Sequence, residues 1–518
     1  MIVSDILANR CIKKRARVFI ACALTVTASF SAGFAQQPGT GNASVQERIQ
    51  ALTEAMNRVE TQMQETQSEL DTIRQELAAL QGTASPASES STVQPEGVSK
   101  LQEAVRSIRE TQVMHDTQIA TLQQSKVESA SEYPLKLTGM VLMTGFVNTR
   151  QVDVAATPTI AVGEPGSTGA TFQQTVLGFD ASGPHLFGAS SHADLRVDFD
   201  GGEPGSGGYA GYKVALLRLR TAHADLLWSR TRLFFSLDRT ILNPNAPTSL
   251  TAVAVPPLAW SGNLWSWNPQ FGVSYDILPV GTGSIRAQAA LIDVADPPPF
   301  NTPIQNSTYT PPATSEFSRW PGAEWRLAYE PSNKRFAYDS ANEEGGLRLG
   351  LSGFFAPHRT AVSQTKFESW AGAADFRIPM TRHMQLSGNA YHGAGLGSLG
   401  GGAYKNYIVQ NISGELYFKT LDDTGGWVQW KQKPNERLEF NEAFGIDDVP
   451  TYQLRPSASL PPVSYYNLTR NRTITGNVIY SPSAYLLLSL EYRRIASSYV
   501  TSSTLTSGVV GIGAGYQF

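Results

Sequence analysis

Four arginines near the middle of the chain have a spacing that suits anion binding. Arg218 and Arg220 are two residues apart, and so are Arg230 and Arg232, so each pair would lie on one face of a β-strand. If the two strands formed a hairpin, four guanidinium groups would stack, with Arg196 one strand away. The planar guanidinium fork matches carboxylate and phosphate, and rings of such groups favour anions in pores.

Three acidic residues near these arginines support a second interpretation. Asp198, Asp225 and Asp238 are close to them in the sequence, so ion pairs would brace the strands instead of binding a solute. A third possibility is a strand register that turns the arginines to the opposite face. The sequence leaves these alternatives open.

A long connection follows the arginines. Residues 242–268 lie between two alternating segments and are rich in Asn, Pro and Trp. Folded inward, this connection would narrow a pore beside the arginines. The residues predicted to form the constriction are Asn243, Asn245, Trp260, Asn263, Trp265 and Trp267.

The elements that must position these residues are short segments with a period of two. From about residue 133 onward, apolar side chains alternate with polar or small ones, for example in residues 231–238, 347–355, 412–419 and 486–493. One face of each segment tolerates lipid and the other carries charge or small polar groups, which is typical of a transmembrane barrel. The strands of a soluble sandwich also alternate, but they are usually shorter.

The last strand has one wholly apolar face. Val510, Ile512, Ala514, Tyr516 and Phe518 alternate with glycines and a glutamine. The aromatic end resembles the carboxy-terminal signal by which bacterial outer-membrane barrels are recognised for assembly, and Tyr516 and Phe518 would carry it. The alternative for this segment alone is the last strand of a soluble sheet.

Connections between the segments alternate between short turns, such as residues 481–483, and long Gly- and Pro-rich stretches, such as residues 295–321. This alternation predicts an all-β transmembrane barrel over residues 133–518. Seventeen candidate strands can be counted, but a closed bacterial barrel needs an even number. We therefore expect about 16 antiparallel strands, with 18 as the next choice.

The chain before the barrel is organised differently. Residues 1–35 combine a basic start, an apolar stretch and small residues, which is the pattern of a secretory signal peptide. Residues 36–82 hold five heptads and predict a coiled coil. Residues 83–97 read as a flexible linker, and residues 98–130 as a second coiled-coil helix.

Within the first coiled coil, Leu70 and Ile73 take heptad positions that favour three or more strands. Both cysteines, Cys11 and Cys22, lie in the signal, so the mature chain would have none. Removal of the signal takes away five basic residues and one acid, and the net charge changes from -3 to -7. A nucleic-acid partner is therefore not expected.

Motifs of common enzymes are absent from the sequence. There is no Gly-x-Ser-x-Gly, no His-Glu-x-x-His and no phosphate loop, and the seven histidines are scattered. We expect no catalytic residues, no cofactor and no metal.

Parts of the barrel sequence resemble a known family. Residues 174–179, the Ser182-Gly183-Pro184 turn and residues 198–201 are similar to a porin pattern of strand, Gly-Pro turn and Asp-Phe strand end. Residues 217–223 and 267–270 resemble the segments on either side of the third porin loop. The layout resembles trimeric outer-membrane porins with an N-terminal coiled coil, such as the dicarboxylate-specific and phosphate-selective porins. Those porins commonly have Ser-Arg where Thr175-Val176 stand here.

This resemblance implies an outer-membrane porin for passive diffusion of small hydrophilic solutes, and the arginines would give it a weak anion preference. It also implies a homotrimer with the coiled coil in the periplasm, contact with outer-membrane lipid, and insertion by the barrel assembly machinery. The alternative is a non-conducting anchor or adhesin-type barrel with a periplasmic coiled-coil tether.

Overall fold

The computed structural model describes residues 135–201, 216–297, 312–331, 346–360, 364–412, 415–455 and 461–518. The predicted signal, coiled coils and linker (residues 1–35, 36–82, 83–97 and 98–130) lie outside these residues. Among the helices of the described part, none is long and apolar enough to cross a membrane.

The described residues are mainly β-strands. The strands are β1 Leu135–Asn148, β2 Gln151–Val152, β3 Ala161–Gly163, β4 Ser167–Thr171, β5 Val176–Leu186, β6 Ala189–Asp198, β7 Arg218–Leu227, β8 Thr231–Arg239, β9 Trp267–Val280, β10 Gly283–Ile292, β11 Gly322–Pro331, β12 Arg348–Arg359, β13 Lys366–Thr381, β14 Met384–Ala394, β15 Tyr407–Ile412, β16 Glu415–Thr420, β17 Asp422–Asn435, β18 Leu438–Asp448, β19 Leu468–Tyr480, β20 Leu486–Tyr499 and β21 Leu505–Gln517. Five helical segments are short: α4 Thr314–Ser318, η3 Gly397–Leu399, η4 Gly402–Tyr404, α5 Thr451–Leu454 and η6 Tyr465–Asn467.

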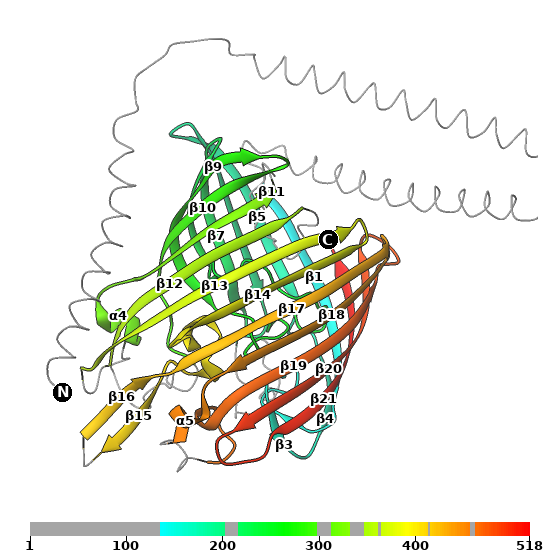
Figure 1. Cartoon of the computed structure of the whole chain (residues 1–518). Helices are drawn as coiled ribbons and strands as arrows, with labels where there is room; N and C mark the ends of the chain where they lie inside the picture. The colour runs from blue at the N-terminus through cyan, green and yellow to red at the C-terminus, as the bar shows by residue number, and fades with distance from the viewer. Residues whose placement is uncertain are drawn as a thin grey trace, which may run out of the picture. The chain divides into compact units, whose positions relative to one another are not determined.

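Antiparallel pairing closes 17 of these strands into one ring (Figure 1), and β2–β3 and β15–β16 form two separate hairpins. Each wall strand pairs with the next in sequence, and β1 pairs with β21 to complete the circle. On its other side β1 pairs with β4 through residues 144–148 and with β5 through residues 135–140. β4 and β5 therefore share one place in the wall, and the barrel has 16 strands as predicted.

Side chains alternate around this wall as the sequence predicted. In β20, Leu490 is 58% exposed on the outer face, whereas its neighbour Glu491 is 2% exposed on the inner face. In β12, Leu351 is 62% exposed and Ser352 is 4% exposed. Apolar side chains thus cover the outside, and polar and charged side chains line the inside.

One predicted wall strand is wrong. Residues 412–419 alternate well, but they do not form a single strand in the ring; β15 and β16 pair only with each other in a separate hairpin. The two residues between them are Ser413 and Gly414. A period of two continues through a two-residue hairpin, so alternation alone does not reveal the reversal.

The predicted Gly-Pro turn is also misplaced. Gly183 and Pro184 lie within β5, where the pairing with β6 shifts by a bulge between Ser182 and His185. The turn comes later, at Phe187 and Gly188, whose φ angles are 52° and 77°. Two residues with positive φ form the tight turn that fits a twisted hairpin.

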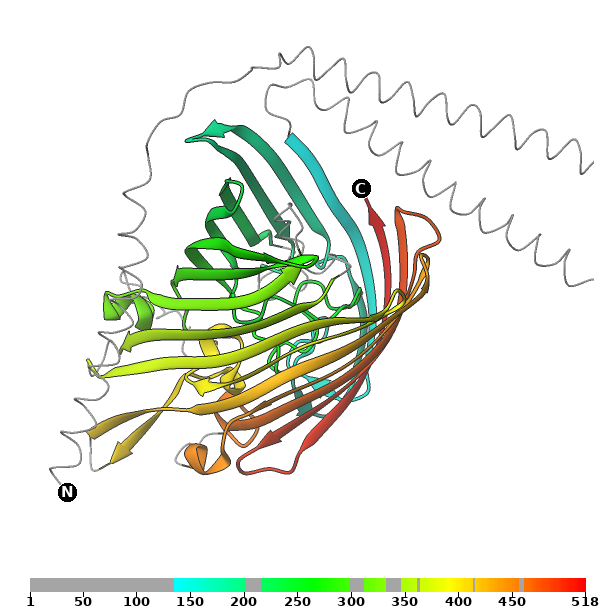
Figure 2. The same ribbon diagram turned by 45° about the horizontal axis from the view of Figure 1, so that its top comes forward.

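Most short turns gather at one end of the ring, the short-turn end, and most long connections gather at the other, the long-connection end. Residues 332–347, between β11 and β12, are a long connection at the short-turn end. Two long connections, residues 240–266 and residues 395–406, lie inside the ring, as Figure 2 shows. We call them the first and second inner segments. Apolar clusters join them to each other and to the wall, with Leu242, Leu264, Leu396 and Leu399 in one cluster and Trp260 and Tyr404 in another.

Candidate functional site in the lumen

The first inner segment crosses the interior from one wall to the opposite wall. At its start, Thr240 Oγ1 donates a hydrogen bond of 2.5 Å to Glu324 Oε2 of β11. Farther along, Ser249 donates a hydrogen bond to Glu491 of β20. Because β20 lies across the ring from β8 and β9, which flank the segment, the segment divides the lumen at this depth.

Polar residues of this segment are buried in hydrogen bonds. Asn243 Nδ2 donates to Asn263 Oδ1 at 2.6 Å, and both side chains have no exposed surface. Asn245, which is 1% exposed, reaches the wall: its Oδ1 accepts hydrogen bonds from Arg348 Nη1 and Arg377 Nη2, each at 3.0 Å. These asparagines fix the path of the segment through the lumen.

The three predicted tryptophans form a row. Trp260 stacks on Tyr404 of the second inner segment with 4.0 Å between ring centroids, and meets Trp265 edge-on at 5.9 Å. Trp265 in turn meets Trp267, the first residue of β9, edge-on at 5.4 Å. Trp260 is 5% exposed, so its role in this row is packing between the two inner segments.

The second inner segment is held by a buried ammonium group. Lys405 Nζ donates hydrogen bonds to the carbonyl oxygens of Ala403, Tyr465 and Leu468 at 2.6, 2.7 and 2.9 Å. Complete burial lowers the pKa of Lys405 to about 7, because the charged form loses its hydration.

Two wall carboxylates complete this attachment. The backbone N–H of Gly402 donates to Asp423 Oδ2 at 2.7 Å, and the backbone N–H of Ala403 donates to Asp447 Oδ1 at 2.6 Å. Tyr391 Oη donates to the other oxygen of Asp447 at 2.6 Å. A glycine-rich connection is thereby bound to β17 and β18 through its own backbone, and Tyr391 of β14 supports Asp447 from the wall.

The predicted arginine stack is not formed. In the β7–β8 hairpin, Ala222 pairs with Leu237 and Leu227 with Arg232. Arg218 and Arg220 are therefore at the long-connection end of the hairpin, and Arg232 is at the short-turn end. Arg230 is exposed in the short turn itself.

Each of the inward arginines has an acidic neighbour. Arg218 forms two hydrogen bonds with Asp198, at 3.0 and 2.6 Å, and Arg220 Nε is 3.7 Å from the same carboxylate. Both guanidinium groups also lie over the Trp267 ring, at 5.1 and 5.2 Å from its centroid. Ala254 of the first inner segment accepts a further hydrogen bond from Arg218 at 2.8 Å, so this group connects wall and segment.

The same bracing holds for the other two arginines. Arg232 Nε and Nη2 both donate to Asp225 Oδ1 at 3.0 Å. Arg196 Nη2 donates to Asp180 Oδ1 at 2.8 Å. The contacts of these arginines therefore match the interpretation in which ion pairs brace the strands.

A larger group of charges, which we call the charged array, lies on β9 to β13. Its members are Arg286, Arg326, Arg348, Arg377, Asp276, Glu330 and Asp375. Arg286 bonds Asp276 at 2.7 Å and Glu330 at 2.8 Å, and Arg326 bonds Glu330 at 2.6 Å and Asp375 at 2.8 Å. Arg348 Nε is 3.6 Å from Glu330. The array meets the first inner segment at Asn245.

Sequence reasoning missed the charged array as a site, although the signal was present. Arg348 occupies the polar face of an alternating segment, and so does Arg286. What the sequence did not provide is the register that brings residues from five strands to one depth.

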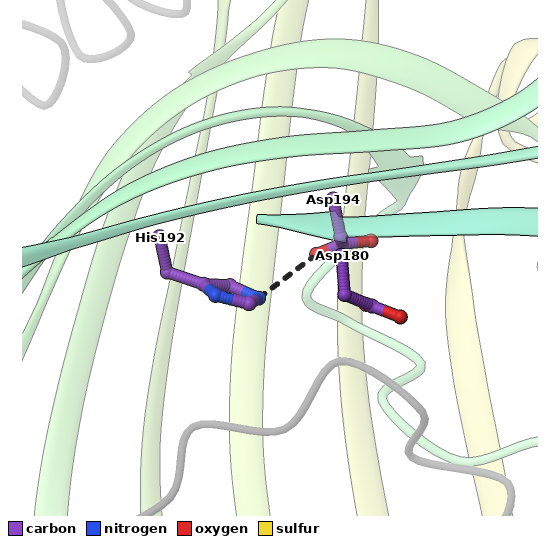
Figure 3. A group of neighbouring side chains, drawn as sticks. All are labelled: Asp180, His192 and Asp194. Carbon is purple, nitrogen blue, oxygen red and sulfur yellow. Dashed lines mark ion pairs between the residues drawn. The ribbon is translucent and has the colours of Figure 1, made fainter. Parts of the chain in front are cut away.

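A separate group of possible metal ligands lies on β5 and β6 (Figure 3). A carboxylate oxygen of Asp180, one of Asp194 and a ring nitrogen of His192 all lie within 4.8 Å of one another. Arg196 already bonds Asp180, and His223 Nδ1 is 3.0 Å from Asp194. A divalent cation here would have to compete with the guanidinium group for Asp180.

The barrel was compared with known proteins. It matches the outer-membrane channel DcaP of Acinetobacter baumannii with a TM-score of 0.55 and 15% identity, over 76% of this chain and 99% of that one. An anion-selective porin from Comamonas acidovorans gives a TM-score of 0.43 and 11% identity over 75% of this chain and all of that one (100%). A Salmonella typhi OmpF complex with daunomycin gives a TM-score of 0.44 and 10% identity over 74% of this chain and 97% of that one.

No family model and no curated protein matches the chain. The match to the Acinetobacter channel establishes the fold: a closed 16-strand barrel of the kind found in bacterial outer-membrane porins.

Proposed function

We propose that this chain is an outer-membrane porin through which small hydrophilic solutes diffuse passively. The observation that carries the proposal is the first inner segment, which crosses the lumen and meets the charged array at Asn245. An apolar outer surface suits lipid, and a polar lumen narrowed by an inner segment suits size-limited diffusion.

The net charge of the charged array supports a weak anion preference. Within the charged array, four arginines face three acids, which leaves one positive charge in excess (4 − 3 = 1). The first inner segment contributes no charge, because residues 240–266 contain no Asp, Glu, Lys or Arg. Selectivity would therefore be set by the wall, and a single excess charge gives a small preference.

Reversal potentials in a salt gradient test this preference. Arg377→Gln removes one positive charge beside Asn245, and Arg218→Gln removes one beside Asp198. We expect both to shift selectivity toward cations. Arg230→Gln makes the same change of charge in an exposed turn and should leave the reversal potential unchanged. Cation selectivity in the wild type, unaltered by the first two substitutions, would contradict the proposed preference.

The assembly that we propose follows from the sequence pattern. The mature chain forms a homotrimer in the bacterial outer membrane, with the coiled coil of residues 36–82 and 98–130 in the periplasm. The signal peptide directs export, and the barrel assembly machinery inserts the chain by its end at Tyr516 and Phe518. The short-turn end then faces the periplasm, as is usual for such barrels.

A second candidate function is a non-conducting anchor barrel with a periplasmic tether. It is favoured by the apolar cluster inside the ring, where Leu242, Leu264, Leu396 and Leu399 have no exposed surface. Two inner segments joined by such a cluster fill part of the lumen. Conductance in a planar bilayer separates the two functions: a porin gives open channels at low voltage, and an anchor gives none.

A further inference from the structure

Two arginines lie on the outer face of the barrel, where apolar side chains predominate. Arg472 of β19 and Arg494 of β20 are both exposed and share that face with Ile474 and Tyr492, which are 58% and 54% exposed. Arg472 pairs with Ala496, and Ile474 pairs with Arg494. The two arginines are therefore diagonal neighbours on one face, with Cα atoms separated by about 7–8 Å.

These arginines differ from the others in their contacts. Two residues along the strand, Arg470 is held by Asp448 through two hydrogen bonds of 2.8 Å. Within the described part of the chain, Arg472 and Arg494 have neither an ion pair nor a hydrogen-bond partner. Two guanidinium groups side by side repel each other unless an anion lies between them.

The depth of the pair is that of a lipid headgroup. Arg494 is eight residues from Leu486 (494 − 486 = 8), and Arg472 is eight from Tyr480 (480 − 472 = 8), both of which lie at the short-turn end. At about 3.3 Å per residue and a tilt of about 40°, eight residues rise about 20 Å. The apolar band of such a barrel is about 25 Å tall, so the guanidinium groups reach its far boundary.

The immediate surroundings leave room for a ligand. Arg494 pairs with Gly508 of β21 on one side and with Ile474 on the other, and Arg472 pairs with Ala496 on one side and with Ile446 on the other. Each arginine therefore has a small residue on one side. A Cβ added at Gly508 would lie 3.2 Å from Tyr492 Oη, which shows that this hydroxyl leans toward β21 beside Arg494. A phenol donor thus accompanies the two guanidinium groups.

We propose that Arg472, Arg494 and Tyr492 bind a phosphate group of a glycolipid in the outer leaflet. The proposal rests on the proposed function, because the orientation of the barrel places this end at the outer surface. The guanidinium fork binds phosphate through two parallel hydrogen bonds, and the apolar side chains below, Leu488 and Leu490, accept the acyl chains. Free phosphate has the same headgroup chemistry but no acyl chain.

The test uses the full mature chain purified in detergent, with bound lipid counted by native mass spectrometry. The probes are lipid A with its phosphates and the same lipid after dephosphorylation. We expect Arg472→Gln and Arg494→Gln each to weaken binding of the phosphorylated lipid about tenfold. Arg470→Gln is the matched control, because Arg470 is also an arginine on the outer face but is already bonded to Asp448. This variant should bind the phosphorylated lipid as well as the wild type does.

Three results would overturn the proposal. The first is that the dephosphorylated lipid binds as tightly as the phosphorylated one. The second is that Arg470→Gln weakens lipid binding as much as Arg472→Gln and Arg494→Gln do. The third is that excess inorganic phosphate displaces the lipid, which would assign the two arginines to free phosphate. Heat-modifiable gel migration checks that each variant is folded. Conductance is measured on the same samples, so a closed barrel would contradict the porin while leaving the lipid result intact.

Discussion

Asn245 is the position where a single substitution should change both the opening and the selectivity of the lumen. Its Oδ1 joins the first inner segment to Arg348 and Arg377 of the wall, and the side chain is almost fully buried. Asn245→Ala removes both hydrogen bonds and leaves the two guanidinium groups facing the space that the amide occupied. The variant should conduct more and prefer anions more strongly.

The size of the effect follows from the two bonds. A hydrogen bond to a charged group contributes about 1.5–3 kcal/mol, so the loss of two removes about 3–6 kcal/mol of attachment. Since about 1.4 kcal/mol is a factor of ten, the displaced form of the segment should gain about a hundredfold or more in relative population. Asn245→Asp should have the opposite effect, because a carboxylate would bind both arginines more strongly and cancel one positive charge.

Single-channel recording with reversal potentials in a salt gradient measures both quantities. Asn243→Ala is the matched control, since Asn243 is the same residue type two positions away but bonds only neutral groups, among them Asn263 and the indole of Trp427. It should change selectivity little. If Asn245→Ala and Asn245→Asp both keep the wild-type conductance and reversal potential, the segment is not positioned by this contact and the reasoning fails.

Other predictions concern assembly and pH. Deleting residues 516–518 removes the hydrogen bonds of Phe518 to Gly139, both 3.0 Å, and should abolish outer-membrane levels on fractionation; normal levels would refute an assembly role for this end. Charged substitutions at Leu70 and Leu77 should unfold the isolated residues 36–82 far more than they weaken the trimer, as circular dichroism and crosslinking would show; a wild type that crosslinks only as a monomer would refute the trimer. Because the pKa of buried Lys405 is lowered from 10.5 to about 7, the unfolded form binds more protons between these values, so the second inner segment should become more stable as the pH rises from 7 toward 10.5. Hydrogen exchange at pH 7 and 9, corrected for intrinsic rates, would measure this; a Lys405→Met variant with the same pH dependence would assign it to other groups.

The direction of each side chain could be predicted from the sequence, because it depends only on the period of two. Leu490 faces outward and Glu491 faces inward, as the period of two predicted for this strand. The choice of 16 strands over 18, made from seventeen candidates because a closed antiparallel ring needs an even number, was also confirmed. These are consequences of local geometry and of lipid on one side of the wall.

Register was the part that could not be predicted in this way. The four-arginine stack required a turn midway between Arg220 and Arg230, but β7 continues to Leu227, and the turn at residues 228–230 places the two pairs at opposite ends. Similarly, the charged array depends on pairings across five strands, which no single segment encodes. The position of the inner segments was equally hard to predict. Lys405 is buried because its ammonium group bonds carbonyl oxygens on η6, on β19 and on its own segment, and the sequence does not show that these come together.

The pairing of β1 with β21 has a consequence for the order in which the chain acquires its structure. Thr144 and Gly513 are partners across a separation of 369 residues (513 − 144 = 369). Joining ends so far apart has a length-dependent entropic cost of about 5 kcal/mol, and nothing offsets it until the last strand pairs with the first. Until then the growing sheet has two open edges that can pair with other chains. The chain must therefore be kept from aggregating until β21 pairs with β1 and removes both open edges at once.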